Sequence, residues 1–340
     1  MKSFKILVFV LFLAIGACKK GNEPAPKVQP TPTKTFYVSD KSFKIVAYFP
    51  SYQNPDSVDV NKYKMITHLF YAFLTPTASG SLNALPQTAR FNQVVNAARS
   101  KGVKVGISIS GANDVFVALA ANVGSRTNLV KNVLAFVKAN NLDGVDLDWE
   151  YPRTTDGSDA TYVLLVKELS DTLHNNNKYL SAAVTPAVYA GSVRDGFRPE
   201  NFQYLDFLNI MMYDGLGWDK TALKQHASYN MSVASFDIWL NTKGLNKEKA
   251  IMGIPSYGRN SANASAGYRT LMAAEAKSNI DSALYNGTVY YYNGTKMVKE
   301  KAMLAKQRGN GIMFWEFYFD TNGSNSLLKA ANDTLGRAYN

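Results

Sequence analysis

Eight short apolar segments recur along the chain, separated by longer polar segments, and this repeat constrains the fold more than any other feature. The apolar segments occupy residues 44–49, 68–74, 103–110, 144–150, 180–185, 207–213, 250–255 and 311–317. Four of the intervening segments, 90–100, 128–140, 161–174 and 235–240, carry apolar residues at helical spacing. Eight strands that alternate with helices predict a single-domain (β/α)8 barrel, the TIM barrel.

A doubly wound open sheet also alternates strands and helices. Such a sheet commonly carries a Gly-rich phosphate loop after its first strand. No such loop follows residues 44–49. The barrel is therefore the favoured fold.

The first residues read as an export signal. Lys2 and Lys5 precede an apolar run, 6–17, that is too short to span a bilayer as a mature anchor. The run ends in Ala-Ile-Gly-Ala-Cys, which resembles a bacterial lipobox, in which the cysteine is lipidated and becomes the new N-terminus. We therefore predict a signal peptide over 1–17, a lipid-anchored flexible tether over 18–38 and the barrel over 39–340, with an ordinary secretory signal as the alternative.

This reading predicts a cell-envelope protein attached to a bacterial membrane through Cys18. We expect the outer membrane; the sequence leaves open which membrane face carries the protein. The tether is rich in Pro, Lys, Thr and Asn and has almost no apolar residues, so it cannot build a core.

Cysteine and charge exclude several classes of function. Cys18 is the only cysteine in the chain, so an intramolecular disulfide and a Cys-based site in the barrel are excluded. The chain has 37 basic and 26 acidic residues, but its lysines are scattered, and we predict no nucleic-acid partner. His68, His174 and His226 show no ligand spacing, so no metal or other cofactor is predicted.

The fourth apolar segment ends in alternating carboxyl and apolar side chains. Asp146, Asp148 and Glu150 occupy every second position. Because successive side chains of a strand point to opposite faces, the three acids share one face. Neighbouring like charges raise a carboxyl's pKa, which keeps an acid protonated near neutral pH. We interpret these residues as catalytic, since barrel enzymes place their active sites at the carboxyl ends of the strands.

Other segments also end in polar or aromatic residues. These are Tyr48, Ser108, Ser110, Tyr213, Asp214, Tyr257, Arg259, Trp315 and Glu316. One such residue would mean little, but their repetition at strand ends predicts that they converge on one site.

On these residues the chain resembles the family 18 glycoside hydrolases, the chitinase family. The fourth-strand pattern of that family is Asp-x-x-Asp-x-Asp-x-Glu, here formed by Asp143, Asp146, Asp148 and Glu150 and followed by Tyr-Pro. Further similarity lies in Ser-Ile-Ser-Gly at 108–111, Met-Met-Tyr-Asp at 211–214, Gly-Ile-Pro-Ser-Tyr-Gly-Arg at 253–259 and Trp315. The resemblance covers nearly the whole chain after the tether.

The resemblance implies a retaining, substrate-assisted hydrolysis of β-1,4 bonds next to N-acetylglucosamine. Glu150 would be the acid that protonates the leaving oxygen, while the substrate's own 2-acetamido oxygen attacks the anomeric carbon to give an oxazolinium intermediate. Asp148 would hold the acetamido nitrogen. Asp146 would share a proton with Asp148, supported by Tyr48 and Ser108. Chitin or chitooligosaccharides are the expected partners of a protein expected to be monomeric.

Other residues are assigned to substrate binding by the same resemblance. Tyr213 would donate a hydrogen bond to the acetamido oxygen, and Asp214 would bind the sugar across the cleft. Trp315 would form the floor under the reacting sugar. Trp218 would line the leaving-group side of the site, and Tyr257 and Arg259 would bind sugar hydroxyls.

For some residues a structural role is the alternative. Arg259 could be an ion-pair partner and Trp218 an exposed loop aromatic. Asp143 is expected to cap a turn or order the strand. Trp149 and Trp239 are interpreted as packing residues, and the tyrosines at 290–292 as core or hairpin residues.

Two features depart from the resemblance. Ser110 stands where the family has a glycine, which could alter close approach at that point. The segment between the last two strands, 260–310, is short, so we expect the insertion found there in many chitinases to be reduced or absent, leaving a shallower cleft.

Two other functions stay open. An endo-β-N-acetylglucosaminidase acting on the chitobiose core of N-glycans shares this fold and these acids, although Tyr213 followed by Asp214 favours a chitinase. A non-catalytic glycan-binding protein on the same barrel is disfavoured because Glu150 is retained.

Overall fold

A computed structural model describes residues 37–339. Cys18, the predicted signal peptide and most of the predicted tether lie outside the described residues. Eight parallel strands form a closed barrel in the order β1-β12-β7-β6-β5-β4-β3-β2. They are β1 (Lys44–Pro50), β2 (His68–Leu74), β3 (Lys104–Ser110), β4 (Gly144–Asp148), β5 (Tyr179–Val184), β6 (Phe207–Ile210), β7 (Ala250–Pro255) and β12 (Gly311–Trp315). The predicted single-domain (β/α)8 barrel is confirmed.

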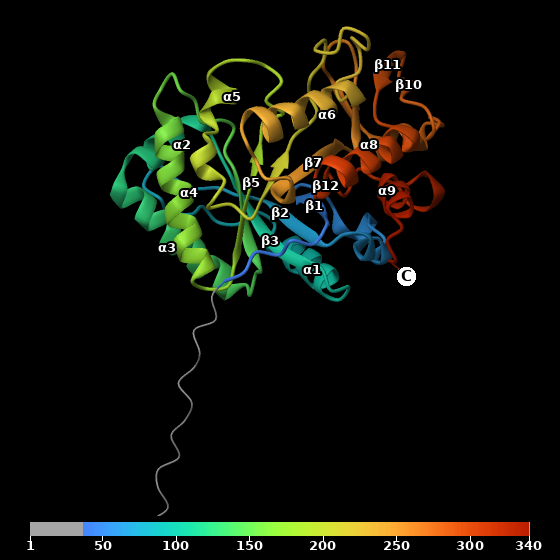
Figure 1. Cartoon of the computed structure of the whole chain (residues 1–340). Helices are drawn as coiled ribbons and strands as arrows, with labels where there is room; N and C mark the ends of the chain where they lie inside the picture. The colour runs from blue at the N-terminus through green and yellow to red at the C-terminus, as the bar shows by residue number, and fades with distance from the viewer. Residues whose placement is uncertain (1–36, 340) are drawn as a thin grey trace, which may run out of the picture. The chain divides into compact units, whose positions relative to one another are not determined.

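Helices surround the barrel strands (Figure 1). They are α1 (Thr88–Arg99), α2 (Asn113–Ala121), α3 (Val123–Ala139), α4 (Ser158–His174), α5 (Ser192–Gly196), α6 (Tyr229–Phe236), α7 (Tyr268–Ala273), α8 (Thr295–Arg308) and α9 (Leu327–Leu335). Short 3-10 helices occupy Pro55–Ser57, Val60–Met65, Pro199–Asn201, Lys247–Lys249 and Gly323–Asn325, and a π-helical turn, Asp237–Thr242, follows α6.

The predicted helices are present, and each begins earlier than expected. The difference is largest for α3 and α6, whose first turns are fixed by caps rather than by apolar residues. Asn122 accepts a hydrogen bond from the Ser125 amide at 3.0 Å, and Ser228 accepts one from the Met231 amide at 3.1 Å. Such caps satisfy amides that the helix itself leaves free.

Three barrel strands end two or three residues earlier than the apolar segments predict. Strand β4 ends at Asp148, β6 at Ile210 and β12 at Trp315. After β6 the chain turns tightly, because the Met212 amide donates to the Ile210 carbonyl at 2.9 Å instead of to a neighbouring strand. Glu150 and Tyr213 therefore lie at the starts of loops, on the rim of the barrel.

The barrel strands are buried on both faces. Alternate residues point outward into the main core beneath the helices, for example Ile45, Ala47 and Phe49 of β1. The residues between them form a second cluster inside the barrel, to which Val46 and Tyr48 belong. This alternation places the polar residues of β3, β4, β5 and β6 inside the barrel, on the line that leads to its mouth.

The segment between β7 and β12 carries a small antiparallel sheet in the order β10-β11-β8-β9, together with α7. Its strands are β8 (Tyr257–Arg259), β9 (Ser265–Gly267), β10 (Ser282–Tyr285) and β11 (Thr288–Tyr291). In Figure 1 the β10–β11 hairpin is the orange element at the upper right. The insertion is thus present in a small form, which agrees with the expected reduction.

The aromatic residues assigned to packing do pack. Trp149 is fully buried and stacks on Phe116 at 5.1 Å between ring centroids. Trp239 is also fully buried, and its indole donates to the Thr185 carbonyl at 3.1 Å. Two of the three tyrosines at 290–292 belong to the β10–β11 hairpin, and the third is buried in the core.

Two further observations concern the described residues. Three non-proline peptide bonds are cis: Ala72–Phe73 inside β2, Glu150–Tyr151 after β4, and Trp315–Glu316 at the end of β12. Within residues 37–339, every helix is too short or too polar to cross a membrane.

Candidate active site

A cavity of about 390 Å³ opens at the carboxyl ends of the barrel strands. Its walls bring together residues from all parts of the sequence, which are Tyr52, Phe73, Ser110, Asp148, Glu150, Tyr151, Pro186, Met211, Tyr213, Asp214, Tyr257, Arg259, Ser265, Trp315 and Phe319. Eight of the strand-end residues that the sequence analysis expects at one site line this surface. Tyr48, Ser108, Asp146 and Glu316 do not line it, because they are buried beneath it or beside it. A smaller cavity of about 140 Å³ lies at the opposite end of the barrel.

Asp146 lies beneath the cavity, fully buried, and accepts four hydrogen bonds. Tyr48 and Ser108 donate to Oδ2 at 2.8 and 2.9 Å, and Ser181 and Asn209 donate to Oδ1 at 2.6 and 3.1 Å. Burial raises the pKa of this carboxyl, and the four donors act in the opposite direction.

Tyr48 and Ser108 are 2% and 0% exposed and do not line the cavity. Both donate to Asp146, so they can act on a substrate only through that carboxyl, which is the supporting role that the resemblance implies. In the described structure the oxygens of Asp146 accept from four neutral donors. The sharing of a proton between Asp146 and Asp148 stays a prediction.

Asp148 lies at the end of β4, between Asp146 and the cavity. Its Oδ1 is buried and has no hydrogen-bond partner within residues 37–339. Burial, followed by the charges of Glu150 and Asp146, raises the pKa of Asp148 well above its usual value. Ser110 pairs with Asp148 across β3 and β4, lines the cavity, and opposes this rise in pKa. The residue that departs from the family pattern therefore lies beside the central acid.

Glu150 lies at the cavity mouth with its side chain exposed. Partial burial by the surrounding residues raises the pKa of the Glu150 carboxyl, and the charge of Asp214 raises it further. Tyr213 is buried nearby, and burial raises the pKa of its hydroxyl well above the usual value. Tyr213 therefore keeps its proton and presents a neutral O–H to the cavity.

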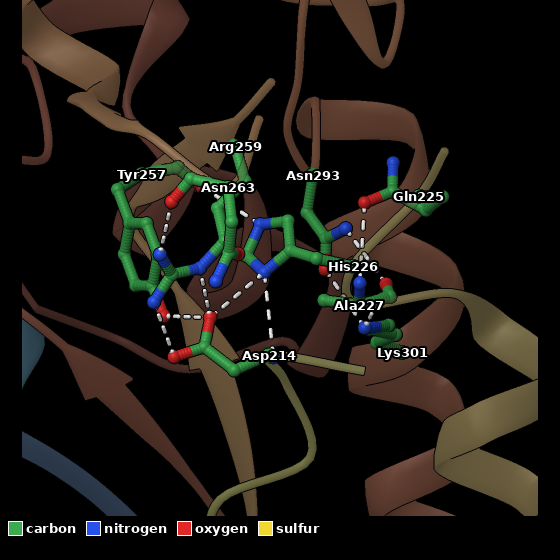
Figure 2. Close-up of polar contacts among 9 residues, drawn as sticks. All are labelled: Asp214, Gln225, His226, Ala227, Tyr257, Arg259, Asn263, Asn293 and Lys301. Atoms are coloured by element: carbon green, nitrogen blue, oxygen red, sulfur yellow. Dashed lines mark hydrogen bonds and ion pairs between the residues drawn. The ribbon is translucent and has the colours of Figure 1, made fainter. Parts of the chain in front are cut away.

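Asp214 is held by three side chains (Figure 2). Arg259 binds both carboxylate oxygens, from Nε at 2.5 Å and from Nη2 at 2.6 Å, and Tyr257 donates to Oδ1 at 2.6 Å. His226 is fully buried, with Nδ1 at 3.2 Å from the same oxygen. Burial raises the pKa of Asp214, but the donors of Arg259 and Tyr257 outweigh it and hold that pKa well below its usual value, so Asp214 is ionised.

The geometry bears on the roles left open for two residues. Arg259 makes a bidentate ion pair with Asp214 and its side chain also lines the cavity, so a contact with sugar hydroxyls stays a prediction. Asp143 accepts the Val105 amide at 2.7 Å, away from the cavity mouth, which is the expected ordering role.

Trp315 and Trp218 differ in their positions. Trp315 lines the cavity, half-buried, and stacks on Phe73 with ring centroids 5.7 Å apart. Trp218 is half-buried outside the cavity lining, and its indole donates to the Val188 carbonyl at 3.3 Å. A sugar-binding role for Trp218 stays a prediction.

Sequence reasoning missed several residues of the site. Ser181 and Asn209 hold Asp146, and each is a polar residue inside an otherwise apolar strand, which is a signal that could have identified them. His226 gave no such signal, because it lies in a loop 12 residues after Asp214. Within residues 37–339, no group of three His, Cys, Asp or Glu side chains is arranged to hold a metal ion.

Comparisons with known proteins agree with this geometry. The sequence model of a family described as "Glycosyl hydrolases family 18" matches residues 44–320. "Probable chitinase 10" of Drosophila melanogaster is 30% identical over 288 residues, which is 72% of this chain and 12% of that protein. "Probable chitinase 2" of the same organism is 31% identical over 227 residues, or 60% of this chain and 47% of that protein.

The solved structures include a similar barrel. It is the crystal structure of the GH18 chitinase from the chitin utilization locus of Flavobacterium johnsoniae, with a TM-score of 0.71 and 27% identity. The alignment covers 87% of this chain and 94% of that one. The chain spans only 12% and 47% of the length of the two curated Drosophila relatives.

Proposed function

The chain belongs to glycosyl hydrolase family 18, and from this premise we propose that it hydrolyses β-1,4 bonds of N-acetylglucosamine-containing glycans. Chitin or chitooligosaccharides are the first candidates. The observation that carries the proposal is the line of three acids, Asp146, Asp148 and Glu150, from the barrel interior to the cavity mouth, each with a raised pKa.

Glu150 is the general acid of the proposed reaction. It lies in the cavity wall where a leaving oxygen can reach it, and its raised pKa favours the protonated form that a general acid needs. When that proton is transferred, the bond between the anomeric carbon and the leaving oxygen breaks. Glu150 is then a carboxylate, which can remove a proton from the water that completes hydrolysis.

Asp148 supports attack by the substrate's own acetamido group. Its unpartnered, buried oxygen can accept the acetamido N–H, and its carboxylate form balances the positive charge of the oxazolinium intermediate. Asp146 is held by Tyr48 and Ser181 two residues before Asp148, and its charge raises the pKa of Asp148. Tyr213, which retains its proton, donates to the acetamido oxygen.

The cavity walls orient the sugar. The indole of Trp315 offers an apolar face on which the C–H groups of a pyranose ring can pack. Across the cavity, the ionised Asp214 accepts hydrogen bonds from sugar groups, since about two fifths of its side chain stays exposed although Arg259 and Tyr257 bind it. This arrangement favours a substrate that carries both a pyranose face and hydrogen-bond donors.

Product analysis by mass spectrometry tests the proposal. The protein and its Glu150→Gln variant are incubated with chitopentaose and with a high-mannose N-glycopeptide. We expect the wild type to cleave chitopentaose and the variant to leave it intact, because Gln has no proton to transfer. Cleavage of the glycopeptide alone, leaving one N-acetylglucosamine on Asn, would instead show an endo-β-N-acetylglucosaminidase. Binding without cleavage of either would show a glycan-binding protein.

We also propose that the protein is anchored in the cell envelope of a bacterium by a lipid on Cys18. This proposal rests on the sequence of residues 1–18 alone. Expression in a bacterium with a clickable fatty-acid analogue should label the wild type and leave Cys18→Ala unlabelled. Equal labelling of the two proteins, or recovery of the wild type without label, would contradict it.

A further inference from the structure

We propose that His226 is a positioning residue of this active site, which fixes Asp214 from beneath and is itself anchored by Asn293 and Lys301. This inference rests on the proposed function, because it concerns how a cavity residue is held. His226 is fully buried and does not line the cavity, so it can act only through its neighbours.

His226 holds the Asp214–Gly215 turn at several points. Its carbonyl accepts the Gly215 amide at 2.8 Å, and its Nδ1 lies 3.4 Å from the Asp214 amide nitrogen. Asp214 has a φ of 63°, in the left-handed region that few residues other than glycine adopt. Contacts on both sides of this residue therefore support a backbone conformation that is unfavourable by itself.

The contacts of His226 define its tautomer. Nε2 lies 3.3 Å from the Tyr257 carbonyl, which can only accept, so Nε2 carries the proton. Nδ1 then has a lone pair that accepts the Asp214 N–H at 3.4 Å, and its 3.2 Å contact with Asp214 Oδ1 is not a hydrogen bond in this tautomer. Burial lowers the pKa of His226, and the charge of Arg259 acts in the same direction, while Asp214 opposes them. The ring is therefore neutral at neutral pH.

His226 also links Asp214 to Tyr257. The imidazole and phenol rings lie 5.1 Å apart, and the Tyr257 hydroxyl donates to Asp214 at 2.6 Å. Asp214, His226 and Tyr257 thus form a closed ring of contacts, to which Arg259 adds its ion pair (Figure 2). A displacement of His226 would move both the Asp214 backbone and one donor to its carboxylate.

The segment that carries His226 is anchored from α8 (Figure 2). Lys301 Nζ donates to the Ala227 carbonyl and to Asn293 Oδ1, both at 2.8 Å, and Asn293 Nδ2 donates to the same carbonyl at 2.9 Å. On the other side of His226, Gln225 donates to the Tyr292 carbonyl at 2.9 Å.

Lys301 is a costly residue to bury in this place. Its side chain is fully buried, and burial lowers its pKa to about 7. Its contacts within residues 37–339 are to neutral oxygens rather than to a carboxylate. A lysine of this kind destabilises the fold unless its donors are used, and here they fix the segment beneath Asp214.

The test compares His226→Phe with His174→Phe. Phenylalanine keeps an aromatic ring and removes both nitrogen atoms. His174 is a matched control because its Nε2 lies 3.0 Å from Asp206, in a His–Asp pair at the other end of the barrel. We expect His226→Phe to lower kcat/KM on chitopentaose by tenfold or more, and His174→Phe to change it by less than twofold.

A double variant separates positioning from a general loss of stability. If His226 acts through Asp214, then His226→Phe combined with Asp214→Asn should be no slower than the slower single variant. The proposal would be overturned if the fold-losses in kcat/KM of the two single variants multiplied in the double variant. It would also be overturned if a folded His226→Phe kept kcat/KM within twofold of the wild type. His226→Asn, whose carbonyl oxygen can replace Nδ1 as acceptor, should recover part of the loss.

A second measurement does not depend on activity. The chain has three histidines, so ring ¹⁵N shifts can be assigned from single His→Phe variants. At pH 7 we expect a protonated Nε2 and an unprotonated Nδ1 for His226; a protonated Nδ1 would overturn the proposed contact. If the wild type hydrolyses no glycan, the proposed function fails, while this spectrum still decides the role of His226.

Discussion

Replacing Asp146 should reveal how much the fold depends on the hydrogen bonds beneath the cavity. In Asp146→Ala the hydroxyls of Tyr48, Ser108 and Ser181 lose the acceptor that they bind in the wild type. Asn209 keeps one acceptor, because its Nδ2 also donates to Tyr48 at 2.9 Å. Three buried donors are thus left without their partner.

The expected magnitude follows from these three donors. A buried donor without an acceptor costs about 1–3 kcal/mol, so three cost at least about 3 kcal/mol. Removing a buried carboxyl with a raised pKa offsets part of this loss, as does any water that enters the vacated space. We therefore expect Asp146→Ala to lower the free energy of unfolding by about 3–5 kcal/mol.

Asp146→Asn is the matched control. Its carbonyl oxygen can keep the bonds from Tyr48 and Ser108, and its amide can donate to a rotated Ser181 hydroxyl. Asn209 can turn its own side-chain oxygen toward the new amide, since that oxygen is buried and unpartnered in the described structure. We expect Asp146→Asn to lower the free energy of unfolding by about 1 kcal/mol, which is the range for one altered hydrogen bond.

Urea unfolding of the wild type and both variants measures the difference. Equal m-values are required for the comparison, because a change in m would indicate a change in the denatured state. The reasoning is refuted if the free energies of unfolding of Asp146→Ala and Asp146→Asn differ by less than about 1 kcal/mol. Three unpartnered donors would then cost no more than one altered hydrogen bond.

Three further predictions concern Asp148, Glu316 and Trp315. Asp148→Asn should lower kcat by at least a hundredfold, and a thiazoline mimic of the oxazolinium should inhibit the wild type competitively in steady-state kinetics; no inhibition would contradict substrate assistance. Burial raises the pKa of Glu316 from 4.5 to about 7. The free energy of unfolding of the wild type should therefore fall relative to that of Glu316→Gln as pH rises from 4.5 through 7, by about 3 kcal/mol in full. Parallel curves of unfolding free energy against pH for the two proteins, measured by urea unfolding, would contradict this. Trp315→Ala should weaken chitopentaose binding at least tenfold in titration calorimetry with the Glu150→Gln protein, and an unchanged affinity would remove Trp315 from the floor of the site.

The barrel could be predicted because its signal is repeated. Each apolar segment is ambiguous alone, but eight of them in alternation with helices fit few folds. The segment ends were less predictable, since the chain stays apolar after the sheet hydrogen bonds stop. Met211 and Met212 illustrate this, because they follow β6 yet remain buried as the chain turns.

The acids of the site could be predicted because they occupy alternate positions in one short segment, in β4 and just after it. Two residues that hold Asp146, Ser181 and Asn209, were missed because each comes from another strand and only the folded sheet brings them to Asp146. Ser181 lies beside Asp146 in the ladder between β4 and β5, whereas Asn209 reaches it from β6. Arg259 shows a second limit: a charged residue at a strand end fits a sugar contact or an ion pair equally well until its distance to Asp214 is known.

The central claim is that the substrate's acetamido group, rather than a free water, attacks the anomeric carbon. Proton NMR of the first product formed from chitopentaose tests it most directly, because the anomeric signal reports the configuration before mutarotation. The account predicts that the β-anomer appears first, since two successive inversions restore the original configuration. First appearance of the α-anomer would show direct attack by water and would contradict the assignment of Asp148 and Glu150 to a substrate-assisted reaction.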